Sequence, residues 1–203
     1  VYNQPQLLRE ALDSVAKQTY AAFEVIVVDD NSTADMKAVV EKYSDVRFIS
    51  HDDNRGAGAA RNTGIEAAAG EYVAFLDADD TWKPTKLEKQ RRVFAESSQE
   101  VGLVYTGFVQ YETDGTEWIH TPSAAGDIYL DELEQDRIHP TSTVMVRRDV
   151  VDEVGGFDAS LPSRQDYDLW IRITEHYEVA YVDDILVEKH EQEGSISKDF
   201  DSR

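Results

Sequence analysis

Acidic side chains gather directly after a buried apolar run of the sequence. Asp77, Asp79 and Asp80 fall within four residues, and they follow the apolar run 72–76. One aspartate at such a place is ordinary turn chemistry, because its carboxylate accepts hydrogen bonds from nearby backbone N–H groups. Three adjacent carboxylates repel one another, which favours a bound cation or protonation. Oxygen ligands shared between carboxylates and substrate phosphates suit Mg²⁺ or Mn²⁺, so we favour a metal–diphosphate site over a structural turn.

A second acidic pair, Asp29 and Asp30, follows the apolar run 23–28. Here two interpretations stand equal, because aspartates also cap strand ends. In the functional interpretation, a carboxylate at this place accepts hydrogen bonds from a nucleobase N–H or a ribose hydroxyl.

The glycine-rich stretch 54–62 opens a helix and contains Arg55 and Arg61. It is not the dinucleotide fingerprint, because Arg61 occupies the place of the third glycine, and it lacks the Gly-Lys-Ser/Thr of a P-loop. Close packing of a helix on a sheet explains the glycines equally well. The two arginines are the natural partners for an anion nearby.

Two further candidates lie in the second half of the chain. Asp166 stands at the start of a predicted helix, where it is either a helix cap or a catalytic carboxylate, and the two roles are compatible. His190 follows a strand-rich stretch. A lone histidine is more often structural than a ligand, but this one could complete a metal site.

The elements that must position these residues alternate between strand and helix. Apolar periodicity predicts helices at 5–16, 31–43, 56–70 and 84–97, and strands at 23–28, 46–50 and 72–76, with Asn3 as the cap of the first helix. This alternation predicts an α/β fold with a mostly parallel, Rossmann-like sheet flanked by helices. Ligands of such sheets bind beyond the carboxyl ends of the strands, where Tyr2 and both acidic groups would meet.

The second half is less regular. We predict strands at 103–111, near Trp118, and at 142–146, 179–182 and 185–187, with a helix at 166–175. The chain reads as a single domain, 1–203, with one lobe at 1–102 and a smaller, mixed lobe at 103–203.

Composition removes several classes of function. The 203 residues include 41 acidic and 20 basic side chains, so the formal net charge is -21. Such a surface repels a phosphate backbone, which argues against nucleic acid as a partner. No apolar run reaches the roughly 18 residues of a membrane span, and the absence of cysteine excludes thiolate sites. The dispersed acidity favours a halophilic protein over an ordinary acidic cytosolic one.

Six motifs, taken in order, resemble the family 2 inverting glycosyltransferases of the GT-A fold. They are Val1-Tyr-Asn, Val28-Asp-Asp-Asn-Ser32, Gly58-Ala-Ala-Arg-Asn-Thr-Gly64, the segment from Gly70 to Asp80, Gly155-Gly-Phe-Asp158 and Gln165-Asp-Tyr-Asp-Leu-Trp170. The resemblance covers essentially the whole chain, and it implies that 1–102 is the nucleotide-sugar-binding lobe and 103–203 the acceptor-binding lobe. Since the family's first strand normally precedes the Tyr-Asn motif, we expect that the amino-terminal strand is truncated here.

The resemblance implies a role for each candidate. Asp77 and Asp79 match the D-x-D motif, whose last aspartate typically binds the metal that holds the donor's diphosphate. Asp30 matches the aspartate that reads the nucleotide base, and Tyr2 would lie against that base. Arg61 would help to hold the phosphates.

For the acceptor side, the resemblance makes Asp166 the general base of the family's Glu-Asp motif, although Gln165 replaces the usual glutamate. That replacement removes a neighbouring charge that could tune the base or bind the acceptor. His190 matches a histidine that some members use as a metal ligand.

The implied reaction is metal-dependent transfer of a sugar, with Mn²⁺ or Mg²⁺, from a UDP-, GDP- or dTDP-sugar to a hydroxyl of a glycan, lipid-linked or protein-linked acceptor. We expect a cytoplasmic protein, or one at the cytoplasmic membrane face through segments outside this chain; the sequence leaves its oligomeric state open.

Two alternatives remain at this point. Asp77-x-Asp79-x-Thr81 also matches the nucleophile motif of haloacid-dehalogenase-like phosphatases. The chain could also be a catalytically inactive nucleotide- or sugar-binding module.

Overall fold

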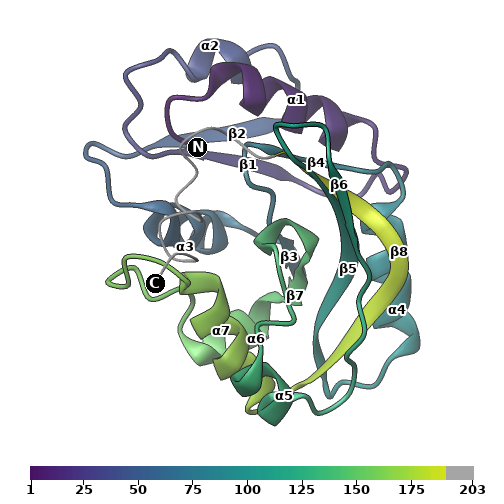
Figure 1. The fold of residues 1–203 in the computed structure, drawn as a ribbon. Helices are drawn as coiled ribbons and strands as arrows, with labels where there is room; N and C mark the ends of the chain where they lie inside the picture. Colours follow the sequence, from purple (N-terminus) through teal and green to yellow (C-terminus); the bar gives the residue numbers. More distant parts are fainter. Residues whose placement is uncertain (191–203) are drawn as a thin grey trace.

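The computed structural model describes residues 1–190, which form one α/β unit whose larger sheet contains strands from both halves of the chain (Figure 1). The helices are α1 Pro5–Ala16, α2 Lys37–Val40, α3 Ala57–Ala67, α4 Lys86–Glu96, α5 Tyr129–Glu134, α6 Arg148–Val154 and α7 Gln165–Thr174, with a 3-10 turn η1 at Thr141–Thr143. The strands are β1 Val25–Asp29, β2 Val46–Ser50, β3 Tyr72–Ala74, β4 Asp80–Trp82, β5 Val101–Tyr111, β6 Glu117–His120, β7 Met145–Arg147 and β8 Glu178–His190.

The first predicted helix is confirmed as α1. Pro5 opens α1, where a missing N–H costs nothing, and Leu8, Leu12 and Val15 are buried on its inner face. The predicted cap is wrong, because Gln4 occupies the cap position and makes no side-chain capping bond. The side chain of Asn3 instead accepts hydrogen bonds in the turn that follows β1.

Two sheets support the site. β1 and β2 form a parallel pair, in register from Val25 opposite Val46 to Asp29 opposite Ser50. Val1 lies beside the end of β1: its amino group donates to the carbonyl of Val28 at 2.7 Å, and its carbonyl accepts from the N–H of Asp30 at 3.0 Å. The start of the chain therefore runs along the strand that ends in the Asp29–Asp30 pair.

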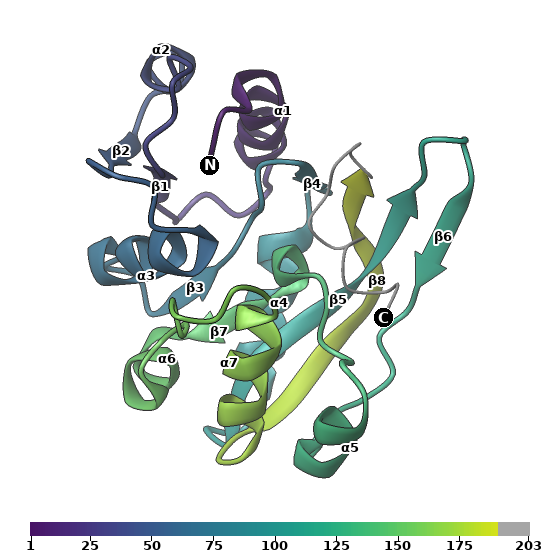
Figure 2. The same cartoon turned by 60° about the vertical axis from the view of Figure 1, so that its left-hand side comes forward.

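The larger sheet has six strands, in the order β3-β7-β5-β8-β4, with β6 paired to β5. Figure 2 shows β5 and β8 as two long curved strands side by side, and they are the parallel pair of this sheet. The other pairs are antiparallel. The α/β class is confirmed, but the larger sheet is mostly antiparallel rather than mostly parallel as predicted. The reason is that β3 pairs with β7, from the second half of the chain, and that the chain adds strand β4, which pairs with β8.

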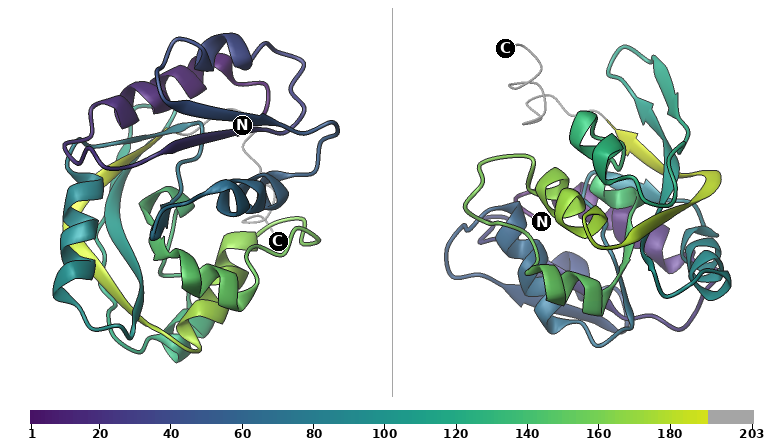
Figure 3. Two further views of the ribbon diagram at one scale, coloured as in Figure 1. Left: turned by 180° about the vertical axis from the view of Figure 1, so that it is seen from behind. Right: turned by 90° about the horizontal axis from the view of Figure 1, so that it is seen from below.

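Helices cover both faces of the larger sheet (Figure 3). Successive residues of a strand point to opposite faces. Leu103 and Tyr105 accordingly pack with Trp170 of α7, whereas Val104 packs with Phe94 of α4. The predicted boundary near residue 103 stays a prediction, since strands from both sides of it share this sheet and the second lobe extends past the described residues.

Gly107 of β5 is required by close packing. A Cβ there would lie 2.6 Å from Cδ1 of Ile185 and 2.7 Å from the carbonyl oxygen of His120. The missing side chain therefore lets β6 and β8 approach β5 from opposite sides.

Other differences from expectation are local. The helix predicted at 31–43 shortens to α2, and the strands at 179–182 and 185–187 are one strand, β8. The predicted strand 142–146 is divided between η1 and β7, while β4, α5 and α6 were not predicted. Within residues 1–190, no helix has both the length and the apolar character needed to cross a bilayer.

Candidate active site

The turn after β1 is closed by side chains on both sides of it. Oδ1 of Asn3 accepts hydrogen bonds from the N–H groups of Thr33 and Ala34, at 2.8 and 3.1 Å. Ser32 donates its hydroxyl to Oδ1 of Asp29 at 2.5 Å. These hydrogen bonds hold residues 31–34 in a turn, so the predicted helix begins only at Lys37.

Asp30 is buried and holds the start of α3. Its Oδ1 accepts from the N–H of Arg55 at 2.9 Å and contacts Nδ1 of His51 at 2.8 Å. Its Oδ2 accepts from the N–H of Gly56 at 2.7 Å. Burial raises the pKa of Asp30, but these hydrogen bonds outweigh it and leave the pKa below its ordinary value. Tyr2, which is 49% exposed, stands at the same edge, and the base-binding roles of both residues stay predictions.

Arg61 of α3 links the acidic groups. Its Nη2 donates to Oδ1 of Asp77 at 2.6 Å, and its guanidinium lies 5.4 Å from the ring centre of Phe157. Burial lowers the pKa of Arg61, but the carboxylates of Asp77, Asp166 and Asp79 raise it above its ordinary value. The structure thus brings three of the predicted site residues around one cation.

The carboxylates between β3 and β4 are crowded. Burial, followed by the charge of Asp77, raises the pKa of Asp79. The same two causes raise the pKa of Asp80 to about 8. Ser142 donates its hydroxyl to Oδ2 of Asp80 at 2.5 Å and accepts the N–H of Asp77 at 3.0 Å. Oδ1 of Asp80 is buried without a partner among the described residues.

These donors fit a divalent cation. Crowded carboxylates with raised pKa values are stabilised by a positive charge, and oxygen atoms are the ligands that Mg²⁺ and Mn²⁺ prefer. Within residues 1–190, no three histidine, aspartate or glutamate side chains gather closely enough to hold a metal by themselves. These carboxylates could therefore supply only part of a coordination shell, and a substrate's phosphate oxygens would have to complete it.

The predicted histidine ligand lies at the end of β8. The ring of His190 is exposed and stacks on Tyr111, with 5.1 Å between ring centres and 16° between planes. Its neighbour Lys189 stands opposite Asp80 in the sheet. Burial and the charge of Asp77 raise the pKa of Asp79, as described above. Two weaker effects lower it, first a hydrogen bond from its own backbone N–H and then the charge of Lys189. The metal role of His190 stays a prediction, and Lys189 is a cation that sequence reasoning missed.

Asp166 is the second residue of α7, so the alternative that it caps this helix is wrong; Arg164, with a left-handed φ of 56°, holds the cap position. Its Oδ2 accepts the hydroxyl of Thr141 at 2.8 Å, and its Oδ1 accepts the N–H of Tyr167 at 3.0 Å. Thr141 comes from the 3-10 turn η1, which no sequence pattern predicted.

Gln165 has a structural task. Its Nε2 donates to the carbonyl of Leu161 at 2.6 Å. A Cβ on Gly58 of α3 would lie 3.1 Å from the Gln165 side chain. The Gln165 amide therefore packs against α3, and its hydrogen bond to Leu161 stabilises the turn that leads into α7.

Comparisons with known proteins agree with this architecture. The family model "Glycosyl transferase family 2" matches residues 1–155. An uncharacterized glycosyltransferase of Rickettsia bellii is 34% identical over 96% of this chain and 30% of its own length. TuaG of Bacillus subtilis, which carries the name of a teichuronic acid biosynthesis glycosyltransferase, is 32% identical over 97% of this chain and 78% of its own. The chain spans about a third of the length of this relative and of a Rickettsia felis one.

Among solved structures, S. aureus TarS 1-349 in complex with UDP-GlcNAc superposes with a TM-score of 0.79 at 22% identity, over 96% of this chain and 58% of that one. At this identity the likeness shows the fold alone, which is the GT-A type expected from the motifs. The phosphatase alternative finds no support, because the family model covers both acidic turns of the first half. The chain belongs to glycosyl transferase family 2.

Proposed function

We propose that this chain is a metal-dependent, inverting glycosyltransferase that moves a sugar from a nucleoside-diphosphate sugar to a hydroxyl acceptor. The observation that carries the proposal is the cluster around Arg61, whose guanidinium is bonded to Asp77 and influenced by both Asp79 and Asp166. Support also comes from neighbours of the same fold. One is TarS with UDP-GlcNAc, and another is a Pyrobaculum calidifontis mannosyltransferase with GDP-Man and Mn²⁺, at a TM-score of 0.70.

The acceptor side begins at Asp166. Its carboxylate takes the proton of the acceptor hydroxyl while that oxygen attacks the anomeric carbon of the donor. The bond from this carbon to the diphosphate oxygen breaks in the same displacement, so the configuration inverts and no enzymic nucleophile is needed. Thr141 holds one oxygen of Asp166, which leaves the carboxylate oriented for this step.

The donor side uses Asp77, Asp79 and Arg61. A divalent cation held by the two aspartates would neutralise the charge that develops on the leaving nucleoside diphosphate. Arg61 orients Asp77 through its 2.6 Å hydrogen bond and adds positive charge beside the phosphates. Tyr2 and Asp30, at the neighbouring strand end, are proposed to contact the nucleotide base, and His190 to approach the metal from β8.

For the acceptor, we propose a glycan or a lipid- or protein-linked glycan, and a cytoplasmic location or one at the cytoplasmic membrane face. The name of TuaG, a relative over most of both chains, supports a role in cell-surface polymer synthesis.

The test is calorimetric titration of UDP, GDP and dTDP, each with and without Mn²⁺. We expect one of these nucleotides to bind, and the metal to tighten binding. Asp166→Asn should retain nucleotide affinity and lose transfer by a factor of about 10² to 10⁴, the usual contribution of a general base. Asp152→Asn, an exposed aspartate of α6, is the matched control and should behave as the unmodified chain.

Two outcomes oppose the proposal. If no nucleotide binds with or without the metal, the chain is an inactive module. If transfer survives in Asp166→Asn, the carboxylate only organises the start of α7.

A further inference from the structure

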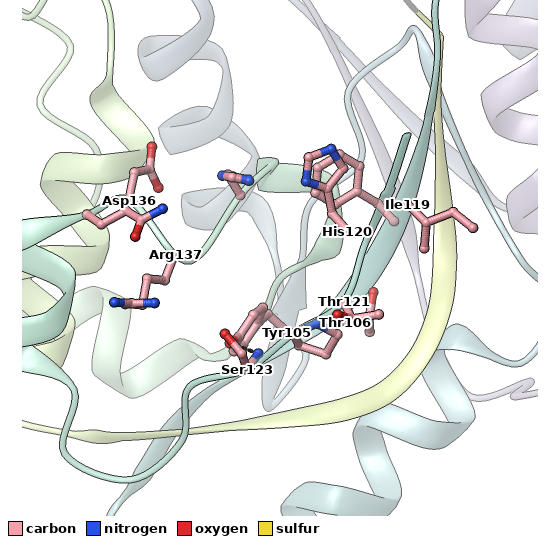
Figure 4. A pocket seen from close by; sticks show the side chains of 12 residues that line it. Tyr105, Thr106, Ile119, His120, Thr121, Ser123, Asp136 and Arg137 are labelled. Atoms are coloured by element: carbon pink, nitrogen blue, oxygen red, sulfur yellow. Dashed lines mark hydrogen bonds between the residues drawn. The ribbon is translucent and has the colours of Figure 1, made fainter. Parts of the chain in front are cut away.

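A pocket of about 290 Å³ lies beside the candidate active site, on the concave side of β5. Its wall is made by β5, the end of β6 with the residues that follow it, and the segment between α5 and η1. Figure 4 shows Asp136 and Arg137 on one side of this pocket and His120 and Ile119 on the other. No role was predicted for any of these four residues.

Two polar atoms in the wall lack partners. Oδ1 of Asp136 and Nε of Arg137 are buried and make no hydrogen bond to any described residue. Another polar group of the same wall is fully used, because the hydroxyl of Tyr105 donates to the carbonyl of Ala124 and accepts its N–H, both at 3.0 Å. A buried polar atom without a hydrogen-bond partner destabilises the fold. The unpartnered acceptor of Asp136 and donor of Arg137 therefore favour a ligand that can both donate and accept hydrogen bonds.

The pocket adjoins the proposed general base. Burial, followed by the charge of Asp166, raises the pKa of Asp136 to about 6. Asp166 also raises the pKa of His139, although burial, His120 and Lys189 outweigh it and lower that pKa to about 4. His139 also comes two residues before Thr141, whose hydroxyl donates to Asp166 at 2.8 Å. A group seated between Asp136 and His139 is therefore near the carboxylate that would accept its proton.

The wall has balanced charge. Burial lowers the pKa of His139 to about 4, and burial with Lys189 lowers the pKa of His120. Both rings are therefore neutral at pH 7, each with one donor and one acceptor nitrogen. Asp136 and Arg137 offset one another. The pocket thus offers several hydrogen-bonding atoms of both kinds, without the excess of positive charge that a phosphate or carboxylate would select.

We propose that this pocket binds the acceptor, and that the acceptor presents a neutral polyhydroxylated ring whose hydroxyls donate to Asp136 and accept from Arg137. Its volume is at the lower end of small-molecule sites, which suits one or two sugar rings rather than a long chain. The inference rests on the proposed function and adds to it where the acceptor sugar binds, that this sugar is uncharged, and two residues that select it.

The test measures acceptor-site binding apart from catalysis. Saturation-transfer NMR on the 203-residue chain, with UDP or GDP and Mn²⁺ present, would use methyl glucoside, methyl galactoside and glucose 6-phosphate as probes. We expect a neutral glycoside to bind more tightly than the phosphate ester. Asp136→Asn and Arg137→Met should each weaken that binding about ten-fold, the effect of losing one hydrogen bond to a charged group.

Two further variants keep the test decisive if a buried substitution fails to fold. Thr121 is an exposed residue of the pocket wall, so Thr121→Trp should fill the pocket and remove glycoside binding in a folded protein. Glu134→Gln, an exposed change on α5 outside the wall, is the matched control. Nucleotide affinity should be the same in the unmodified chain, the folded pocket variants and the control.

The proposal is overturned by glycoside binding that persists in folded pocket variants, by tighter binding of glucose 6-phosphate, or by no glycoside binding in a chain that binds nucleotide. If the unmodified chain binds no nucleotide, the proposed function itself fails, and that result is distinct from all three.

Discussion

Glu132 of α5 carries a buried charge that the fold does not compensate. Its side chain is fully buried; Oε2 accepts the N–H of Arg137 at 3.2 Å, while Oε1 has no partner among the described residues. Burial raises the pKa of Glu132 from 4.5 to about 7, and Asp136 adds to the rise, against the lowering effect of the Arg137 N–H. Ionisation of this carboxyl should therefore destabilise the folded state.

The size of the effect follows from this pKa difference, which corresponds to about 3 kcal/mol. Since the folded pKa is raised, the folded state binds more protons than the unfolded state between pH 4.5 and about 7. This group's contribution to stability therefore falls as pH rises through that window and is flat above it. Between pH 5 and pH 8 the loss amounts to about 2.5 kcal/mol.

The substitution Glu132→Gln removes this titration and keeps the size of the side chain. We expect urea denaturation at pH 5, 6, 7 and 8, at constant salt, to show the variant gaining stability relative to the unmodified chain as pH rises. The total relative gain should be about 2.5 kcal/mol. A difference in stability that is the same at every pH can be added to this gain, because the new amide also lacks a second hydrogen-bond partner.

The matched control is Glu134→Gln on the same helix, where the side chain is exposed. Its stability relative to the unmodified chain should be nearly independent of pH. If Glu132→Gln also gives a difference that does not change with pH, the carboxyl is hydrated or charge-compensated in the folded state, and the reasoning from its burial is refuted.

Three further predictions concern stability. Lys86 is fully buried over Trp82, and burial lowers its pKa well below 10.5. Lys86→Met should therefore raise the melting temperature, and the rise should grow as pH falls. An unchanged melting temperature would refute the idea that the buried ammonium group lacks a compensating charge. Asn62 exchanges two 2.8 Å hydrogen bonds with the backbone of Phe157, so Asn62→Ala should cost about 2 kcal/mol in urea denaturation, whereas no loss would show that these bonds are replaced by water. With a net charge of -21, the melting temperature should rise strongly from low to molar KCl, and a flat response would exclude salt adaptation.

Regular elements were predictable because their periodicity is local. Residues 5–16 carry apolar side chains at helical spacing, and residues 46–50 form a strand where apolar alternation places one. The helix at 31–43 failed for a physical reason: Asn3 and Asp29 bind the turn through contacts that are distant in sequence or made by short polar side chains. Pattern reasoning sees apolar spacing and misses such competition.

Parts of the site were beyond prediction for a related reason. Ser142 and Thr141 act through single hydroxyls in a 3-10 turn, and nothing in their spacing distinguishes them from ordinary loop residues. Helix α5 was missed because Leu130 and Leu133, its largest apolar side chains, are exposed, while Glu132 is buried. The usual apolar-in pattern is thus inverted there, and the same segment leads into the pocket that holds Asp136 and Arg137.

Surroundings, rather than acidity, separate the functional carboxylates from the many others. Asp30 is ionised easily, because two backbone N–H groups and His51 bond to its oxygens. A carboxylate has about four acceptor sites, so one remains for the nucleotide base that we propose. Substitution of Asp30 would disturb the start of α3 in any case. For Asp79 and Asp80 the balance is the reverse, because burial and the charge of Asp77 raise the pKa of both carboxyls. A bound cation would stabilise these ionised carboxylates, which is why the turn from Asp77 to Asp80 is the place where the proposed metal requirement should be tested first.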